Sequence, residues 1–256
     1  PTMNRFFSIS TLVSTIESAK TSDRWLLRLL LVCVFAALIW FILTLNQMVS
    51  VTGISAGGSF TEGIIGTPRF VNPALALTRA DQDMTSLIYS GLMKIDTDGS
   101  LKNDIATAIE VSEDGFTYKV KLREDIYFHD GEQLTSEDIL FTINLIQNDE
   151  LKSPLRSNWS GVTIEAVDEQ NLLISISEPY APFNENFTLG ILPAHIWSQI
   201  PIEQVPFSEF NTTPVGTGPY SVKDASFSRS GTVEEYHLLA AQNYNNALIS
   251  EINIQF

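Results

Sequence analysis

The chain has 256 residues, of which 44% are apolar and 18% charged, and its formal net charge is −15. This length and apolar content suffice for one large domain or two modest ones. The acidic balance argues against nucleic-acid binding, which needs a basic face to meet phosphate. The single cysteine, Cys33, lies within an apolar run, so the sequence excludes a disulfide framework and a cysteine-based zinc site.

The N-terminal part differs from the rest in charge. Residues 1–28 carry a net charge of +2, whereas the remainder holds 11 basic and 28 acidic residues. Residues 1–24 are polar and are predicted to be a cytoplasmic tail. Residues 25–46 are predicted to be a transmembrane anchor, because their uncharged run from residue 29 is about long enough to cross ~30 Å of hydrocarbon. Basic residues on the N-terminal side predict that the later residues lie outside the cytoplasm.

A cleaved signal peptide is the alternative for this segment. We favour the uncleaved anchor, since the apolar core of a signal peptide is only ~7–15 residues long. Lipidation of Cys33 is not expected, because Val32 rather than a small residue precedes it. Residues 47–57 are predicted to be a linker, and residues 58–256 the globular part.

The globular part begins with alternating strand and helix signals. A strand is predicted over residues 59–65. A loop is predicted over residues 67–73, because a helix cannot run through both of its prolines. A helix is predicted over residues 83–93, followed by a passage into a strand.

The central stretch of the chain has the strongest local pattern. Asp114-Gly115 is a hairpin-turn signal, because Gly takes a positive φ without steric cost. Residues 116–122 then alternate between apolar and polar, which predicts a half-buried strand. After a second Asp-Gly turn at residues 130–131, Thr135 is a candidate N-cap with Asp138 at the capping-box position, so a helix is predicted there.

The remaining residues, from 162 to 256, are predicted to form mostly strands. A hairpin is predicted over residues 162–177, and a short helix beginning at Pro193. Further strands are predicted from Tyr220, over residues 233–240 and over residues 251–256. Because the sequence stops within an alternating strand, we expect a truncated chain.

Three segments carry a family resemblance. Residues 114–142, DGFTYKVKLREDIYFHDGEQLTSEDILFT, resemble the signature region of extracellular solute-binding protein family 5, the oligopeptide-, dipeptide- and nickel-binding proteins of ABC importers. Residues 216–220, GTGPY, match a second family pattern, and Asn72-Pro73 matches a third. The resemblance runs from about residue 58 to residue 256, which is only the N-terminal half of a family member.

The resemblance implies a fold and a function. The fold would be α/β, a periplasmic-binding-protein-like type II lobe with an inserted subdomain, preceded by one transmembrane helix. The chain would be the membrane-anchored, extracytoplasmic binding component of an ABC importer, capturing oligopeptides or dipeptides in a cleft between lobes. Its partners would be a peptide, the importer permease and the lipid bilayer. The alternatives are binding of a nickel chelate or another small solute, or an anchored interaction or sensor module without transport.

The resemblance also implies a binding segment. Counted from Asn72-Pro73, Leu77, Thr78 and Arg79 would face the cleft, and Arg79 could meet a peptide carboxylate. The competing interpretation of Arg79 is an ordinary solvated arginine near a helix start. No catalytic residue, metal site or cofactor is predicted, since the sequence has no HExxH or phosphate-binding-loop motif. His129 is interpreted as a turn histidine with local hydrogen bonds.

Overall fold

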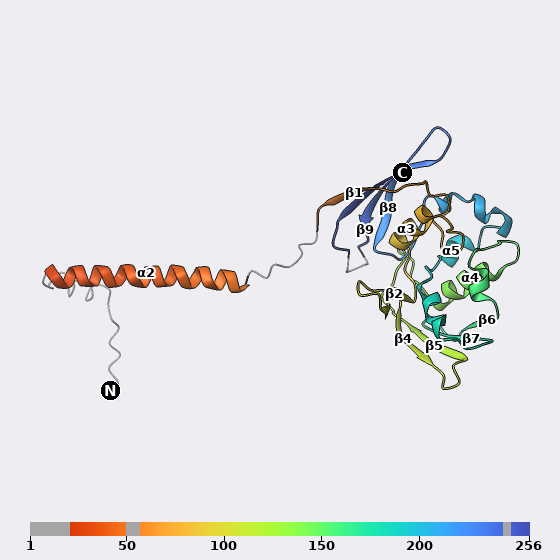
Figure 1. The fold of residues 1–256 in the computed structure, drawn as a ribbon, viewed down its shortest axis with the longest axis horizontal. Helices are drawn as coiled ribbons and strands as arrows, with labels where there is room; N and C mark the ends of the chain where they lie inside the picture. Colours follow the sequence, from red (N-terminus) through yellow and green to blue (C-terminus); the bar gives the residue numbers. More distant parts are fainter. Residues whose placement is uncertain (1–20, 50–56, 243–246) are drawn as a thin grey trace, which may run out of the picture. The chain divides into compact units, whose positions relative to one another are not determined.

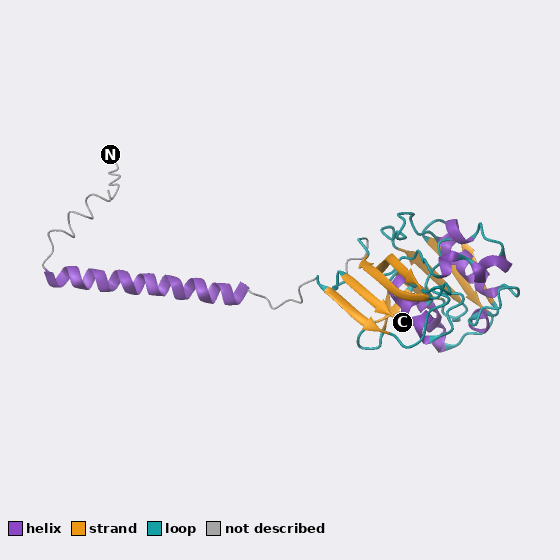
Figure 2. Ribbon diagram, turned by 90° about the horizontal axis from the view of Figure 1, so that it is seen from above, coloured by secondary structure: helices purple, strands orange, loops and turns teal. Residues whose placement is uncertain are grey.

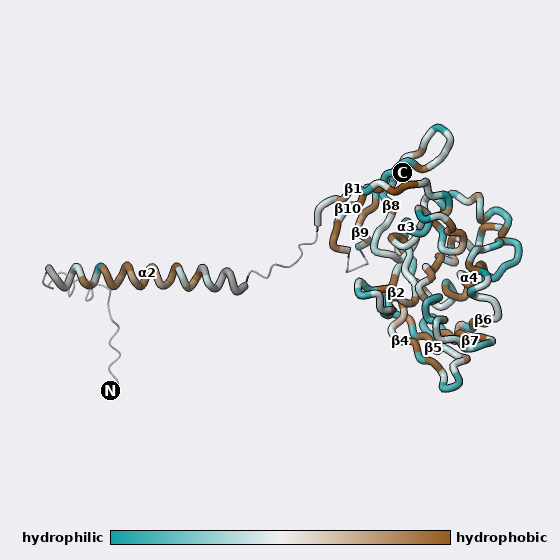
Figure 3. Tube along the Cα trace, viewed as in Figure 1, coloured by the Kyte–Doolittle hydropathy of each residue, from teal (hydrophilic) through white to brown (hydrophobic). Residues whose placement is uncertain are grey.

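The computed structural model describes residues 21–49, 57–242 and 247–256 (Figure 1). These residues belong to two compact units, Pro1–Ile54 and Ser55–Phe256. In the first unit the described element is helix α2 (Thr21–Val49), whose apolar central part is visible in Figure 3. Among the described residues, the structure has no helix with the length and apolarity that crossing a membrane requires. The anchor predicted over residues 25–46 is therefore not shown and stays a prediction.

The other N-terminal predictions are largely untested. The predicted tail covers residues 1–24, of which 1–20 lie outside the described residues. The predicted linker covers residues 47–57, of which 50–56 also lie outside them.

The strands of the second unit are orange in Figure 2. Those of its first sheet have the order β1-β10-β9-β8. Its members are β1 (Ser59–Gly63), β8 (Tyr220–Phe227), β9 (Val233–Ala240) and β10 (Glu251–Gln255). Strands β8, β9 and β10 pair antiparallel, whereas β1 pairs parallel to β10, with Phe60 opposite Ile252. The first and last strands of the unit thus lie side by side, and each of these strands was predicted from sequence.

The second sheet has the order β4-β5-β7-β6 and is wholly antiparallel. Its members are β4 (Ala106–Val111), β5 (Thr117–Leu122), β6 (Val162–Ala166) and β7 (Asn171–Ile176). The alternation predicted for residues 116–122 is confirmed, because Tyr118, Val120 and Leu122 are buried. A separate hairpin joins β2 (Met93–Ile95) to β3 (Leu101–Asn103).

In the described part of the second unit, three α-helices accompany the sheets: α3 (Arg79–Ile88), α4 (Ser136–Gln147) and α5 (Ala194–Trp197). Helix α4 begins after Thr135 as predicted, and the Thr135 N–H donates to Asp138 Oδ2 at 2.8 Å. Helix α5 begins after Pro193, also as predicted. Short 3₁₀ turns fill the connections at Arg156–Trp159, Ala181–Thr188, Ile202–Phe207 and Glu209–Asn211.

The helix predicted over residues 83–93 is misplaced at both ends. It begins at Arg79, because Thr78 and Asp81 form a capping box there. It ends at Ile88, after which Tyr89 is extended, with φ −117° and ψ 144°. A Cβ added to Gly91 would lie 2.7 Å from the Phe187 carbonyl oxygen, so this passage into β2 has no space for a side chain at residue 91.

One contiguous hydrophobic core joins the two sheets and the helices. Its largest fully buried side chains include Trp159, Trp197, Tyr236 and Phe128. Aromatic contacts reinforce the part beneath the second sheet, where the rings of Tyr118 and Phe187 lie edge to face at 5.3 Å. The described fold is therefore mixed α/β, as predicted.

Candidate functional site

The loop before α3 is organised around a buried carboxylate. Asp81 is 1% exposed and accepts four backbone hydrogen bonds. These come from the N–H groups of Arg69 (2.7 Å), Phe70 (2.9 Å), Leu77 (3.3 Å) and Thr78 (2.9 Å). Burial acts to raise the pKa of Asp81, but the hydrogen bonds from this loop outweigh it and hold the pKa below its usual value. One side chain thus fixes both ends of the segment that carries Asn72-Pro73.

Asn72 fixes the middle of the same loop. Its side chain is fully buried; Nδ2 donates to Asn211 Oδ1 at 3.1 Å, and Oδ1 accepts the Ala74 N–H at 2.9 Å. The Asn72 carbonyl accepts from the N–H groups of Leu75 and Ala76, which closes a turn immediately after Pro73. The loop therefore reaches α3 in a defined conformation.

The three predicted binding residues lie together where α3 begins. Leu77 is 70% exposed. The Thr78 hydroxyl is the N-cap and accepts the Asp81 N–H at 3.1 Å. Arg79 has a largely exposed side chain that pairs with Asp83 at 3.1 Å. This placement agrees with the interpretation of Arg79 as a solvated arginine near a helix start. It does not test contact with a ligand, so the assignment of Leu77, Thr78 and Arg79 to a binding segment stays a prediction.

A cavity of about 320 Å³ lies directly beside this segment, and we call it the α3 pocket. The polar side chains on its helical wall, Gln82, Thr85 and Ser86, repeat at helical spacing. The full lining is Pro73, Ala76, Gln82, Thr85, Ser86, Tyr89, Leu155, Thr188, Leu189 and Gly190. Leu77, Thr78 and Arg79 do not line it, although Ala76 immediately precedes them.

Two polar atoms in residues that line the α3 pocket lack a hydrogen-bond partner among the described residues. They are Thr85 Oγ1 and the Tyr89 hydroxyl, and both are buried. Burial, with Tyr236 nearby, raises the pKa of the Tyr89 phenol, so it stays protonated and able to donate. Buried polar groups are almost always paired, and Thr85 lies on the helical wall of the pocket, so its unpaired hydroxyl is a reason to expect a polar ligand group there.

A second cavity adjoins the first. It measures about 430 Å³, and we call it the Ser90 pocket. It shares Ser86, Tyr89 and Thr188 with the α3 pocket and extends toward Lys94 and Asp104, which form an ion pair at 3.1 Å. The α3 pocket and the Ser90 pocket lie next to each other along one side of α3 and together form a recess. An elongated ligand could occupy both parts of this recess, whereas a compact ligand would occupy one.

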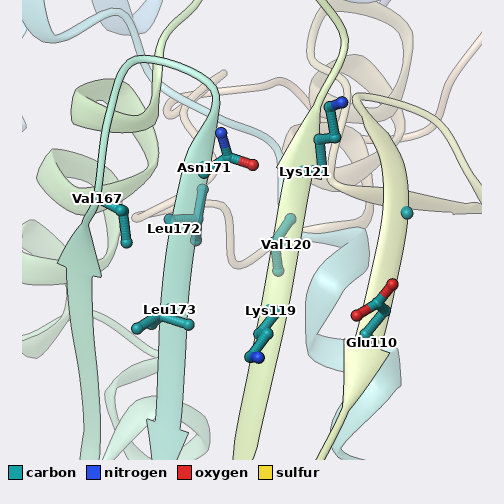
Figure 4. A pocket seen from close by; sticks show the side chains of 9 residues that line it. Glu110, Lys119, Val120, Lys121, Val167, Asn171, Leu172 and Leu173 are labelled. Carbon is teal, nitrogen blue, oxygen red and sulfur yellow. The ribbon is translucent and has the colours of Figure 1, made fainter.

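A third cavity, about 410 Å³, lies on the outer face of the second sheet (Figure 4). Lys119 and Lys121 stand on β5, with Asn171 and Leu173 beside them on β7. Successive side chains along a strand point to opposite faces of the sheet. The lysines of this cavity therefore belong to the face that a half-exposed strand presents to solvent. It includes no residue of the Asn72-Pro73 segment, and we favour the α3 pocket as the candidate site.

The histidines do not gather into a chemical site. His129 contacts the loop at residues 216–218, and His195 Nε2 lies 2.8 Å from Asp130 Oδ2. The interpretation of His129 as a locally bonded turn residue is wrong, because its ring partners are 87 and 89 positions away. Within the described part of the chain, no group of three His, Cys, Asp or Glu side chains could hold a metal ion.

Sequence reasoning missed the lining of the α3 pocket. Gln82, Thr85, Ser86 and Tyr89 have the i, i+3, i+4, i+7 spacing of one helical face, and this signal was available. It was obscured because the helix was placed from residue 83 instead of residue 79. The opposite wall, Leu155 with Thr188, has no comparable signal, since only the tertiary fold brings it to α3.

Comparisons with known proteins agree on one family. Residues 100–256 match the model described as "Bacterial extracellular solute-binding proteins, family 5 Middle". The oligopeptide-binding protein AppA of Bacillus subtilis (strain 168) is 30% identical over 172 residues, which cover 66% of this chain and 32% of the relative. The chain thus spans about a third of the length of this curated relative.

Solved structures show the same partial match. The structure of Bacillus subtilis AppA in complex with a nonapeptide superposes with a TM-score of 0.72 at 26% identity, covering 78% of this chain and 40% of that one. NikZ from Campylobacter jejuni in complex with Ni(L-His) gives a TM-score of 0.64 at 24% identity, covering 80% and 39%, and shows the likeness in fold alone.

Proposed function

The chain belongs to the bacterial extracellular solute-binding proteins of family 5, and on this premise we propose that it supplies one side of a peptide-binding cleft in an ABC importer. Family membership confirms that this is a solute-binding protein and not an enzyme. The part played by this chain is non-covalent capture of an oligopeptide or dipeptide, which is then delivered to a permease.

The α3 pocket is the observation that carries the proposal. It adjoins the segment Leu77–Arg79, is bounded by polar side chains on α3, and includes the unpaired Thr85 hydroxyl. An extended peptide offers backbone N–H and C=O groups at every residue, so it can satisfy such wall atoms whatever its side chains are. The nonapeptide in the AppA structure supports the assignment of a peptide rather than a small solute.

The architecture proposed for the whole protein has two lobes. The described α/β part would be a type II lobe, with the β4-β5-β7-β6 sheet and α4 as its inserted subdomain. Capture would occur as a second lobe closes over the α3 pocket by hinge motion. Because this chain spans about a third of the length of its curated relative, closure is a property of the longer protein.

The proposal predicts that filling the α3 pocket weakens peptide binding. Ser86 is exposed and lines both the α3 pocket and the Ser90 pocket. We expect Ser86→Trp to weaken binding of a random-sequence nonapeptide library about tenfold or more, measured by calorimetric titration. Ser230→Trp, in the exposed turn between β8 and β9, is the matched control and should bind as the unmodified chain does.

The same titration separates the alternatives. Equal affinities for Ser86→Trp and the unmodified chain would contradict the assignment of the α3 pocket. Displacement of the library by a nickel–histidine complex would favour the small-solute alternative over the peptide.

Attachment to a bilayer through residues 25–46 is a further part of the proposal, which the structure does not show. It is supported by apolar side chains that are exposed on α2, among them Leu29 at 68%, Val32 at 66% and Trp40 at 72%. We expect the full chain to stay with the membrane fraction through an alkaline carbonate wash, because buried apolar side chains resist such extraction. Quantitative release into the wash would contradict the anchor.

A further inference from the structure

The ring of His129 joins two segments that are distant in sequence. His129 lies in the loop between β5 and α4, and the other segment is residues 215–219, which leads into β8. The Gly216 N–H donates to His129 Nδ1 at 3.3 Å, and Nε2 lies 3.0 Å from the Gly218 carbonyl oxygen. The His129 backbone N–H also donates to the Gly216 carbonyl at 2.8 Å.

These partners fix the protonation state of the ring. A carbonyl oxygen can only accept, so Nε2 carries the proton and donates to Gly218. A backbone N–H can only donate, so Nδ1 presents its lone pair to Gly216. The neutral imidazole satisfies both contacts, whereas the imidazolium would place an N–H against the Gly216 N–H and lose one hydrogen bond.

The segment that His129 holds is packed against the end of α3. The Gly218 N–H donates to the Ile88 carbonyl at 2.8 Å, and the Ser90 N–H donates to Thr217 Oγ1 at 3.3 Å. The next residues along these segments line the recess, because Tyr89 lines both pockets and Pro219 lines the Ser90 pocket. His129 thus lies one layer behind the pocket wall, with the glycine loop between them.

We propose that His129 is a positioning residue for ligand binding, whose neutral ring holds residues 215–219 against Ile88–Ser90 and whose protonation releases this wall and weakens binding. The inference rests on the proposed function for its effect on the ligand, but the loop contacts stand without it. The role of His129 depends on protonation of its ring, and the ring itself does not contact the ligand.

The other ionisable groups around His129 are few. Asp130 follows it in the same turn, and its carboxylate pairs with His195 of α5 at 2.8 Å. Asp138 of α4 lies near His195, and from the end of α3 the Tyr89 phenol faces the glycine loop. Burial lowers the pKa of His129, although the Gly218 carbonyl and Asp130 act to raise it. The loop residues 215–219 contribute no ionisable side chain.

The test measures binding of the nonapeptide library to the full chain between about pH 7.5 and pH 4.5, which extends below the ordinary range of imidazole because burial lowers the pKa of His129. We expect about fivefold or greater weakening toward the acid end for the unmodified chain, the usual scale of coupling between a proton and a ligand. His129→Gln keeps one acceptor and one donor but cannot titrate, so its affinity should vary little with pH. His195→Gln removes the neighbouring imidazole and should keep the pH dependence of the unmodified chain.

A second readout separates this inference from the proposed function. Imidazole ¹⁵N shifts of the ligand-free full chain should show His129 as the Nε2–H tautomer near neutral pH, and the amide signals of residues 216–218 should move as it titrates. Those movements should be absent in His129→Gln. If no peptide binds yet these signals behave as expected, the proposed function fails and the loop contacts stand. An Nδ1–H tautomer, or the same pH dependence of binding in His129→Gln, overturns the inference.

Discussion

Gly216→Ala should separate the loop at residues 215–219 from the end of α3, beside the candidate site. We expect it to lower the free energy of unfolding by about 3 kcal/mol, at the upper end of the range for overpacking. A Cβ at residue 216 would lie 2.1 Å from the Ile88 carbonyl oxygen and 2.9 Å from Tyr89 Cδ1. The first obstacle is backbone, which cannot move aside as a flexible side chain can. The loop must then leave the end of α3, which also breaks the hydrogen bond from Gly218 N–H to Ile88.

Denaturant unfolding of the full chain measures this effect. The matched control is Gly63→Ala, since a Cβ there meets nothing within 4 Å and Gly63 does not have a positive φ. We expect the control to change the free energy of unfolding by less than about 0.5 kcal/mol. If Gly216→Ala is as stable as Gly63→Ala, the close packing of the glycine loop on α3 is wrong.

The second large effect should come from Asp81→Asn, which we expect to cost about 3 kcal/mol of unfolding free energy. The carboxylate accepts four backbone N–H groups, whereas an amide has a single acceptor oxygen and turns its own N–H₂ toward donors. Buried N–H groups that lose a charged acceptor each cost roughly 1–3 kcal/mol, with partial relaxation of the loop lowering the total. The segment Arg69–Thr78 should loosen, and with it the entry to the α3 pocket.

The pH dependence of this effect has a definite sign. The pKa of Asp81 is lowered in the folded state, so its contribution to stability is present above the unfolded value of about 4 and is lost as the pH falls through the folded value. The stability difference between the unmodified chain and Asp81→Asn should therefore shrink below about pH 4. Asp83→Asn is the control. The Asp83 carboxylate pairs with the exposed Arg79 side chain, so its loss should cost less than about 1 kcal/mol. A loss in Asp83→Asn equal to that in Asp81→Asn would contradict the account.

Much of the fold follows from local patterns in the sequence. The two predicted Asp-Gly turns are confirmed, with Gly115 and Gly131 both at positive φ. Period-two alternation located β5 and β10, because each of them has alternately buried side chains, whereas strand β4 was not predicted. The pairing of β1 with β10 was not predictable from these patterns, since it joins residues almost two hundred positions apart through a parallel register that no turn specifies.

Helix α3 shows why a boundary matters for the site. Thr78 and Asp81 are a weaker capping signal than Thr-x-x-Glu, and they follow a loop with two prolines. Once the helix is placed from Arg79, the face with Gln82 and Ser86 becomes visible as a polar stripe. The opposite wall, which includes Leu155, could not be found in this way, because contacts between segments distant in sequence produce no periodic pattern in the sequence.

His129 illustrates the same limit for a single side chain. The sequence placed it correctly in a turn between β5 and α4. Its partners Gly216 and Gly218 belong to a motif that the family resemblance also singled out, but nothing in either motif indicates that the two meet. The contact depends on the chain returning to β8 past the end of α3, which is a property of topology.

Hydrogen–deuterium exchange of the full chain, with and without the random-sequence nonapeptide library, tests the central claim most directly. If α3 forms one side of a peptide-binding cleft, added peptide should slow exchange at residues 74–91, around Leu155 and at residues 188–190, where the α3 pocket lies. Protection confined to β4, β5 and β7, beside the third cavity, would move the binding site to the second sheet. No protection anywhere in the described residues would contradict peptide capture by this chain.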